Sequence, residues 1–498
     1  MRVSEVLAKL RAAGVVPTGI SADSRHVGTG EVFAAWPGAV SDGRRYLDAA
    51  IAHGAAAVLY EGSDGFRPPL MTRPAIAVDG LRDLAGDLAH EICGHPSEKL
   101  WMAGVTGTNG KTTISQWLAQ ALGALDTPCG VIGTLGSGFP GVLTAGLNTT
   151  PDALEVHRTL AGFEHAGARA AAMEVSSIGL DQGRVNGVQF DVAVFTNLTR
   201  DHIDYHGSME AYAAAKARLF DSPGLGRAVI NLDDEFGLEQ AQRLAARGDM
   251  HLIGYTTAAQ AATAPPGVLT LVGDNVRASA AGLRFDLVWD GQQAELDVRL
   301  VGTFNVSNLL AVIGSLLHYG VAMDDIVRVV QTLSPPPGRM QRVGGEGEPL
   351  VVVDYAHTPD ALAKVLDAVR GSARARGGRL ICVFGCGGDR DAGKRPQMGA
   401  VASRLADRVI VTSDNPRSEA PQKIIDAILA GAGPKTETLL DRGAAIRTVV
   451  SNASAHDVIV IAGKGHEPYQ EIRGERRPFS DLEQATQALA AWRGRVAA

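Results

Sequence analysis

Short, continuously apolar runs, each followed by polar residues, recur through most of this 498-residue chain. Strands of this kind are buried on both faces, as in a parallel sheet covered by helices. In open α/β sheets, ligands bind at the carboxyl ends of the strands. The pattern therefore predicts an α/β fold with binding residues at strand ends. The runs lie at 100–105, 170–175, 191–197 and 228–234, and then at 350–357, 379–388, 407–417 and 457–467.

Two interruptions divide the chain into parts. The segment "GHPSEKL" (94–100) indicates the end of a small α/β domain, and "LSPPPGRMQRV" (333–343) contains consecutive prolines that cannot continue a helix. At roughly 150 residues per domain, the length also fits about three domains. Between the interruptions, residues 283–300 alternate in polarity on either side of Asp290-Gly291, which predicts an antiparallel hairpin.

Composition excludes several classes of protein. A net charge of -7 argues against a general nucleic-acid binder, and no stretch has the length of a bare membrane span. Residues 1–16 carry charges among apolar positions and predict an amphipathic helix, not a signal peptide. The four cysteines form no CxxC pair, which argues against a disulfide framework or zinc site and favours a cytoplasmic protein. They are Cys93, Cys129, Cys382 and Cys386.

A phosphate-binding loop is predicted between an apolar run and a helix at "GVTGTNGKTT" (104–113). The standard pattern G-x-x-x-x-G-K-[ST] needs glycine at 105, where Val105 stands. We expect Gly107 to make the close approach to phosphate, Lys111 to reach the β- and γ-phosphates, and the Thr112 hydroxyl to meet Mg²⁺. An ordinary Gly-rich turn is the alternative. The expected nucleotide-binding residues are Gly107, Thr108, Asn109, Gly110, Lys111, Thr112 and Thr113.

Three further stretches carry candidate reactive residues. Glu174 ends an apolar run, His202 lies in "FTNLTRDHIDYHG" (195–207), and Lys216 lies in "AYAAAKARLF" (211–220). Taken singly, these residues would be a helix cap, a loop histidine and a solvated lysine. No guanine-reading motif is present, because "NLTRD" (197–201) lacks the lysine.

Taken together and in order, these motifs resemble the Mur ligase family, the ATP-dependent amide-forming enzymes of peptidoglycan precursor synthesis. The resemblance extends over nearly the whole chain. It also includes "ADSR" (22–25), "NTTP" (148–151), "GTFNVSNLLA" (302–311), "PGRMQRV" (337–343), "VVDYAHTP" (352–359), "GCGGDRDAGKRP" (385–396), "SDNPR" (413–417) and "AGKGHE" (462–467).

The resemblance implies a three-domain α/β protein. Residues 1–98 would bind uridine, 99–335 would form a central P-loop-type ATPase domain with a mostly parallel sheet, and 336–498 would form a Rossmann-like amino-acid domain. It is strongest to members that add meso-diaminopimelate to UDP-N-acetylmuramoyl-L-alanyl-D-glutamate. In the family, ATP phosphorylates a substrate carboxylate, and an amine attacks the acyl phosphate. We expect a cytoplasmic monomer that neither binds nucleic acid nor inserts into membranes.

Family likeness assigns roles to individual residues. Lys111, Glu174, His202 and Lys216 would be catalytic. Thr112 and Glu174 would hold one Mg²⁺, and His202, with Glu174 and Lys216 as a carbamate, would hold a second. Asn305, Arg339 and Asp354 would contact adenine, phosphate and ribose. The substrate residues would be Ser24, Asn148, Thr149, Thr150, Ser176, Gln182 and Arg184, with Arg390, Asp414, Asn415, Pro416, Arg417, Gly463 and Glu467 for diaminopimelate.

Arg417 is the residue on which acceptor choice depends. Its guanidinium would pair with the distal carboxylate that lysine lacks, and Glu467 would suit the distal ammonium. Ile178 and Ala39-Val40-Ser41 depart from the usual family pattern. The first leaves one polar contact to substrate open, and side-chain contacts to uridine are not expected at 39 and 40. The alternatives are the same reaction with L-lysine or ornithine, a folylpolyglutamate synthase, and a nucleotide-gated binding protein without synthetic chemistry.

Overall fold

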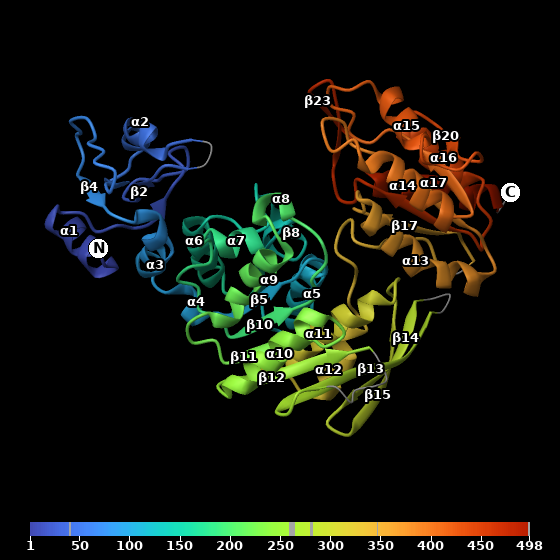
Figure 1. Cartoon of the computed structure of the whole chain (residues 1–498), viewed down its shortest axis with the longest axis horizontal. Coiled ribbons are helices and arrows are strands. Elements are labelled where there is room, and N and C mark those ends of the chain that lie inside the picture. Colours follow the sequence, from blue (N-terminus) through green and yellow to red (C-terminus); the bar gives the residue numbers. More distant parts are fainter. Residues whose placement is uncertain (39–40, 258–263, 279–281, 346, 497–498) are drawn as a thin grey trace. The chain divides into compact units, whose positions relative to one another are not determined.

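The computed structural model describes residues 1–38, 41–257, 264–278, 282–345 and 347–496. The chain divides into two compact units. Figure 1 labels its helices and strands and colours them along the sequence. Most of unit 1 is Met1–Thr256 with Ala311–Ile326, and most of unit 2 is Val272–Leu310 with Val327–Ala498. Three elements contribute residues to both units. They are β13 (Val268–Ala278), α11 (Phe304–Tyr319) and α12 (Met323–Val330).

Unit 1 begins with a small parallel sheet in the order β1-β2-β3-β4. Its strands are short and its core is built mainly of aliphatic side chains from β2, β3 and the helix α3. The predicted amino-terminal helix is present as α1, with Val6 and Leu10 buried. The elements are α1 (Val3–Ala12), β1 (Ile20–Ser21), β2 (Val32–Ala35), η1 (Gly43–Tyr46), α2 (Leu47–Ala52), β3 (Ala57–Glu61), β4 (Ala75–Val78) and α3 (Leu81–Ile92).

The larger sheet of unit 1 runs β12-β11-β10-β5-β9-β6, all parallel, and continues into antiparallel β7 and β8. Its predicted strands are confirmed, and nearly every residue in them is buried. The strands are β5 (Trp101–Thr106), β6 (Cys129–Gly133), β7 (Gly136–Phe139), β8 (Val142–Thr144), β9 (Ala170–Glu174), β10 (Val192–Phe195), β11 (Arg227–Asn231) and β12 (His251–Thr256). The helices are α4 (Pro96–Lys99), α5 (Lys111–Ala124), α6 (Ala153–His165), α7 (Ser177–Asp181), α8 (Ile203–His206), α9 (Met209–Ala217), η2 (Arg218–Asp221) and α10 (Glu235–Arg247).

Unit 2 contains the predicted antiparallel hairpin. Strands β14 (Leu283–Trp289) and β15 (Gln292–Val298) pair from Leu283↔Val298 to Trp289↔Gln292. Asp290 and Gly291 form the turn, with φ of 47° and 73°. A two-residue hairpin loop with positive φ at both positions matches the twist of its strands, and Asp-Gly suits it.

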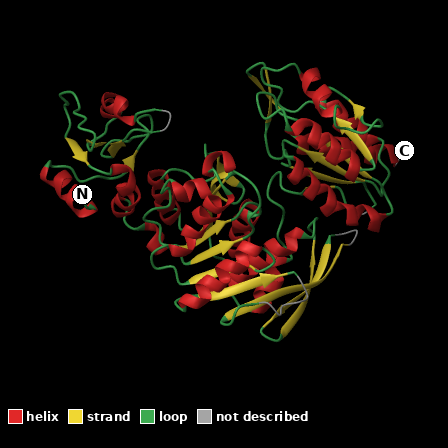
Figure 2. Ribbon diagram, in the orientation of Figure 1, coloured by secondary structure: helices red, strands yellow, loops and turns green. Residues whose placement is uncertain are grey.

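A six-stranded sheet of unit 2 is doubly wound, in the order β16-β17-β21-β18-β19-β20, with only β16 antiparallel. Helices α13, α14 and α15 pack on one face of this sheet, and α16 and α17 pack on the other. Figure 2 shows the helices of the chain in red and its strands in yellow. The strands are β16 (Gln341–Val343), β17 (Leu350–Asp354), β18 (Leu380–Phe384), β19 (Arg408–Val411), β20 (Glu437–Thr438), β21 (Val458–Ala462) and the hairpin β22 (Tyr469–Ile472) and β23 (Glu475–Pro478). The helices are α13 (Pro359–Arg376), α14 (Lys394–Leu405), α15 (Pro421–Leu429), α16 (Arg442–Ser451) and α17 (Asp481–Val496).

The predicted α/β fold class is confirmed, and the motif residues follow the carboxyl ends of its strands. Glu174 ends β9, Asp354 ends β17, and Gly463 directly follows β21. In the part of the chain that the structure describes, no helix combines the length and apolar character needed to cross a bilayer.

Candidate functional site

The phosphate loop connects β5 to α5, which begins at Lys111. Gly107 has a φ of 142°, and a Cβ built there would lie 1.8 Å from Thr196 Oγ1. Only glycine fits, because any side chain would collide with the neighbouring strand end. The close approach that the structure shows at Gly107 is to Thr196 within the chain, and the approach to phosphate stays a prediction.

Asn197 holds two backbone N–H groups of this loop. The Thr108 N–H donates to the Asn197 carbonyl oxygen at 2.7 Å, and the Asn109 N–H donates to Asn197 Oδ1 at 3.0 Å. These two N–H groups therefore fix the loop to the end of β10. The N–H groups of Thr112 and Thr113 precede the first helical bond, from Ile114 to Gly110, and so have no acceptor within α5. The first turn of α5 is thus the part suited to phosphate.

Two lysines reach the loop from different helices. Lys111 Nζ donates to the carbonyl oxygens of Gly107 at 2.8 Å and Thr108 at 2.9 Å. Lys216 on α9 is 1% exposed, and its Nζ also donates to the Gly107 oxygen at 2.8 Å. Burial, and then the charge of Lys111, lower the pKa of Lys216 well below its ordinary value. The structure therefore brings both predicted lysines to one point of the loop.

Glu174 is buried beside the start of α5. Its Oε2 accepts from the Thr112 hydroxyl at 3.0 Å and from the Thr134 hydroxyl at 3.0 Å, and its Oε1 accepts from the Thr134 N–H at 2.8 Å. The structure thus joins the two predicted Mg²⁺ ligands, Thr112 and Glu174. Our sequence interpretation missed Thr134, although it follows an apolar strand, β6, as the other motif residues do.

His202 is the outlying member of the predicted metal set. It precedes α8 with a φ of 51°, and its side chain is 48% exposed. Its ring centroid lies 6.2 Å from that of Tyr212, whose hydroxyl is 3.1 Å from Thr108 Oγ1. Tyr212 therefore connects His202 to the phosphate loop.

Four of the predicted substrate residues form one hydrogen-bonded group. Thr150 Oγ1 donates to the Glu174 carbonyl and lies 3.0 Å from Ser176 Oγ. Arg184 donates to the Thr150 carbonyl at 2.7 Å and to Gln182 Oε1 at 2.7 Å. Gln182 also lines a cavity of about 710 Å³ with Arg82, Tyr205 and Arg218. These hydrogen bonds link the end of β9, which carries Glu174, to Gln182 at the wall of this cavity.

The remaining substrate residues of unit 1 are more open. Asn148 is exposed, Thr149 Oγ1 lies 3.0 Å from Thr134 Oγ1, and Ser24 is half-buried in a turn after β1. Of the departures from the family pattern, Ile178 is half-buried in α7 and Ser41 is exposed. Ala39 and Val40 lie outside the described residues.

Unit 2 contains the predicted adenine and ribose residues. Asn305 is 3% exposed, donates to the Val301 carbonyl at 2.7 Å, and accepts from Asn308 at 3.0 Å. Asp354 accepts two backbone N–H bonds at 2.8 Å, and burial raises the pKa of its carboxyl. The Arg339 guanidinium lies over the Tyr355 ring, 5.3 Å from its centroid.

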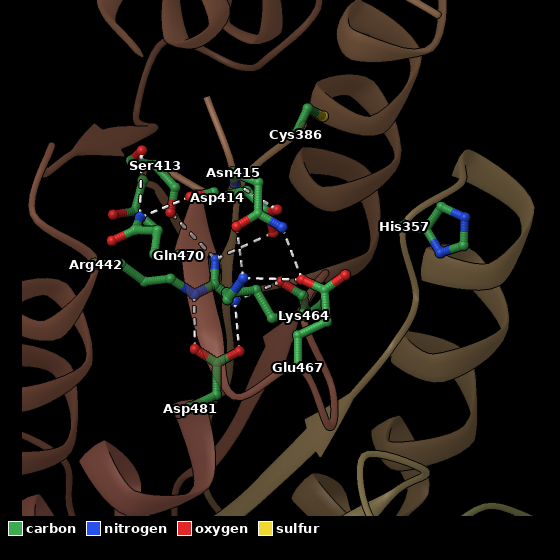
Figure 3. A network of polar contacts seen from close by, with 12 residues as sticks. His357, Cys386, Ser413, Asp414, Asn415, Arg442, Lys464, Glu467, Gln470 and Asp481 are labelled. Atoms are coloured by element: carbon green, nitrogen blue, oxygen red, sulfur yellow. Dashed lines mark hydrogen bonds and ion pairs between the residues drawn. The ribbon is translucent and has the colours of Figure 1, made fainter. Parts of the chain in front are cut away.

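Residues of the predicted amino-acid site meet at the ends of β19 and β21 (Figure 3). Asn415 Nδ2 donates to Glu467 Oε2 at 2.8 Å. Lys464 donates to Asn415 Oδ1 and to Glu467 Oε2, at 2.9 Å each. A Cβ on Gly463 would lie 2.7 Å from Asp414 Oδ2, so glycine allows these segments to approach. Lys464 has no exposed side-chain surface, and our sequence interpretation did not single it out.

Arg417 lies in the turn 414–417, which follows β19, and its backbone has a φ of 49°. Its Nη1 donates to the Gly388 carbonyl at 2.7 Å, and its Nε lies 3.8 Å from Glu471 Oε2. Pro416 is buried, and its carbonyl would lie 2.0 Å from a Cβ on Gly388. Arg390 is exposed beyond β18. The strained backbone at Arg417 is fixed on both sides, because its N–H and C=O bond to Glu471 and Arg473.

Comparison with known proteins gives the family. The Mur ligase family catalytic domain matches residues 17–91, the Mur ligase middle domain matches 105–316, and the Mur ligase glutamate ligase domain matches 338–465. The UDP-N-acetylmuramoyl-L-alanyl-D-glutamate–2,6-diaminopimelate ligase of Pseudomonas aeruginosa is 54% identical over 476 residues, which is 95% of each chain. This chain belongs to the Mur ligase family. The ligase of the same name from Ralstonia nicotianae is 50% identical to this chain over 497 residues, which is 98% of this chain and 96% of that ligase.

Solved structures of Mur ligases share the fold. A UDP-N-acetylmuramoyl-L-alanyl-D-glutamate–2,6-diaminopimelate ligase is similar at a TM-score of 0.71 and 38% identity, over 96% of this chain and 95% of that one. MurF ligase from Thermotoga maritima, solved with ADP, gives 0.64 at 17% identity over 95% and 98%. A folylpolyglutamate synthase from Mycobacterium tuberculosis gives 0.59 at 18% identity, over 77% of this chain and 92% of that one. The last two likenesses concern the fold alone.

Proposed function

We propose that this protein is an ATP-dependent ligase that joins meso-diaminopimelate to the D-glutamate γ-carboxylate of UDP-N-acetylmuramoyl-L-alanyl-D-glutamate. The observation that carries this proposal is similarity over the whole chain to relatives named for that nucleotide and 2,6-diaminopimelate, at 54% identity. The phosphate loop and the buried Glu174 beside it supply the matching chemistry. The meso configuration follows from family likeness.

The reaction has two steps. A carboxylate is a poor acyl donor, so the γ-phosphoryl group of ATP is first transferred to it, giving an acyl phosphate and ADP. The amine then attacks the acyl carbon, and inorganic phosphate leaves as the amide forms. Lys111 and the first turn of α5 would stabilise the phosphate charge. Lys111 donates to two loop carbonyls here, so binding exchanges those acceptors for phosphate oxygens.

The donor set beside the loop fits Mg²⁺. The Thr112 hydroxyl and Glu174 carboxylate are adjacent hard oxygen donors, 3.0 Å apart. When bound, Mg²⁺ would neutralise charge on the phosphates. A buried lysine ammonium would repel the ion. Lys216 would gain a fitting oxygen donor as a carbamate, formed when its neutral amine takes up CO₂ and releases a proton; we propose His202 and Glu174 as its partners at a second ion.

We propose three domains, residues 1–98, 99–335 and 336–498, in a cytoplasmic monomer. Ser24 would contact uridine, Asn305 adenine, and Arg339 and Asp354 the phosphate and ribose. The muramoyl dipeptide would contact Asn148, Thr149, Thr150, Ser176, Gln182 and Arg184. Diaminopimelate would contact Arg390, Asp414, Asn415, Pro416, Arg417, Gly463 and Glu467.

An acceptor assay tests the proposal. The purified protein receives ATP, Mg²⁺, the UDP-linked dipeptide and one of meso-diaminopimelate, L-lysine or ornithine, and phosphate release is measured. We expect turnover with diaminopimelate only. Arg417→Ala should reduce kcat/KM for it by about 10³-fold or more, because the distal carboxylate loses a bidentate partner. Arg408→Ala, which removes an ion pair with Glu437 on a neighbouring strand, is the control and should keep full activity. Equal use of lysine by the parent protein would overturn the specificity.

The rival with a shared fold is a folylpolyglutamate synthase. The match of residues 17–91 to the Mur ligase family catalytic domain argues against it, as does the Arg417 turn. Supplying a tetrahydrofolate and glutamate in place of the two proposed substrates separates these functions. Phosphate release that depends on the folate, and not on the UDP-linked dipeptide, would favour the rival. ATP turnover independent of any acceptor would favour a nucleotide-gated binding protein.

A further inference from the structure

A fully buried ion pair lies beneath the proposed amino-acid site of unit 2. Arg442 Nε donates to Asp481 Oδ1, and Arg442 Nη2 donates to Asp481 Oδ2, at 2.7 Å each. Neither side chain has exposed surface. Arg442 is the first residue of α16 and Asp481 the first of α17, so the pair joins the starts of two helices on one face of the sheet. Figure 3 shows the carboxylate facing the guanidinium fork.

The same guanidinium contacts the ends of two strands that carry proposed diaminopimelate residues. Its Nη2 donates to the carbonyl of Ala462, the last residue of β21, at 2.9 Å. Its Nη1 donates to the carbonyl of Ser413 at 3.5 Å and lies 3.9 Å from Asp414 Oδ2. Ala462 directly precedes Gly463, and Ser413 directly precedes the turn 414–417. The Arg442 side chain therefore bonds both to the end of β21 and to the residue before the turn 414–417.

Stability alone is a weak reason for such a pair. Removing a guanidinium and a carboxylate from water costs free energy, and well-packed apolar residues of similar size are often at least as stabilising. Apolar residues cannot donate hydrogen bonds to two separate carbonyls, whereas the planar fork of arginine has five donors in fixed directions. The pair thus fits a role in setting geometry.

We propose that Arg442, oriented by Asp481, is a positioning residue that fixes the turn 414–417 against the segment 463–467 and so determines affinity for the amino-acid acceptor. It acts through the Ser413 and Ala462 carbonyls and does not contact the acceptor. This inference rests on the proposed function for the identity of the acceptor. The geometry on which it depends, one guanidinium between two strand ends, is independent of that identity.

Arg442→Lys in the full-length protein is the main test. Lysine keeps the charge and can still pair with Asp481, but its single ammonium cannot reproduce the fork. We expect the KM for diaminopimelate to rise about 10- to 100-fold, because small displacements of binding groups are costly. The KM values for ATP and the UDP-linked dipeptide, and kcat at saturation, should stay within about threefold of the parent. Asp481→Asn, which keeps the shape but weakens orientation, should give a smaller shift in the same direction.

A matched control is available at the start of β21, the strand whose last residue accepts from Arg442. Asp457 directly precedes β21 and pairs with Arg379, Nη2 to Oδ2 at 2.9 Å. Arg379→Lys weakens an ion pair of this sheet without contacting the turn 414–417. It should leave the KM for diaminopimelate unchanged.

Hydrogen exchange on the free protein gives a readout that needs no substrate. Amides of 413–417 and 462–467 should exchange at least about tenfold faster in Arg442→Lys, while those of β5 and α5 stay unchanged. If the parent protein used another acceptor, the proposed function would fail, yet this exchange result would still stand. An unchanged KM with unchanged exchange would overturn the positioning role. Equal rises in the KM for all three substrates would also overturn it. If Arg442→Lys fails to fold, Asp481→Asn decides: a folded Asp481→Asn protein with parental KM and parental exchange would overturn the positioning role.

Discussion

Lys111 and Lys216 donate to the same acceptor, the carbonyl oxygen of Gly107, at 2.8 Å each. One lysine begins the helix after the loop, and the other comes from α9, 109 residues away from Gly107. Two amines held this close repel each other when both are charged, so the charge of Lys111 adds to burial, the larger cause, in lowering the pKa of Lys216. An anion at the loop relieves that repulsion, so the arrangement favours a phosphate ligand.

Gly107→Ala should strongly reduce ATP-dependent turnover. The new methyl group would collide with Thr196 Oγ1, and the positive φ is unfavourable for alanine. We expect turnover to fall at least about 100-fold and the protein to lose about 1–3 kcal/mol of stability. Gly123→Ala in α5 is the matched control: a Cβ there meets nothing within 4 Å, and alanine favours a helix interior. Parental activity in Gly107→Ala would contradict the role given to this glycine.

Glu174→Gln should lower kcat at least about 100-fold with little loss of stability, because the amide keeps the shape but removes the charge expected to meet Mg²⁺. Raising the Mg²⁺ concentration should restore part of the activity. The measurement is phosphate release at saturating substrates over a Mg²⁺ series. Glu210→Gln, an exposed residue in the first turn of α9, should behave as the parent does. A Glu174→Gln enzyme with normal kcat would remove this residue from the proposed metal set.

Thr134→Val tests the residue that sequence interpretation missed. Valine keeps the side-chain shape and the backbone N–H bond to Glu174 but removes the hydroxyl that donates at 3.0 Å. We expect kcat to fall about tenfold, since Glu174 loses one of the donors that orient it. Thr144→Val on the exposed strand β8 is the control and should change nothing. If both variants kept parental kcat, the Thr134 hydroxyl would have no part in orienting Glu174.

Stability should fall as the pH drops from neutral. Burial lowers the pKa of His157 from 6.5 to about 4, and its Nε2–H donates to the Asn186 carbonyl at 2.9 Å. Between these pKa values the unfolded chain binds a proton that the folded chain does not. The folded state therefore loses up to about 3 kcal/mol as pH falls from 6.5 to 4. Urea unfolding of His157→Gln should show a flatter pH dependence, whereas His165→Gln, on the exposed side of the same helix, should follow the parent.

Much of the fold and part of the site could be predicted from the sequence, because those features depend on local patterns. Apolar runs predicted the buried strands, and Glu174 was singled out because it ends such a run. Asp354 and Asp414 were assigned by the family resemblance, and they lie at or just beyond strand ends. Thr134 follows a run as well, but nothing local distinguishes it from an ordinary turn threonine. Arg442 and Lys464 acquire their roles only through partners tens of residues away. Such long-range pairing leaves no periodic signal.

The attachment of the phosphate loop to Asn197 has a consequence for folding. Residues 101–124 contain the complete strand and helix on either side of the loop, yet two loop N–H groups find their acceptors only when β10 lies beside β5. A nascent chain that has not emerged as far as residue 197 therefore lacks the acceptors that fix the loop. The loop takes its observed shape only once β10 has paired with β5, so its conformation depends on a contact between segments 88 residues apart.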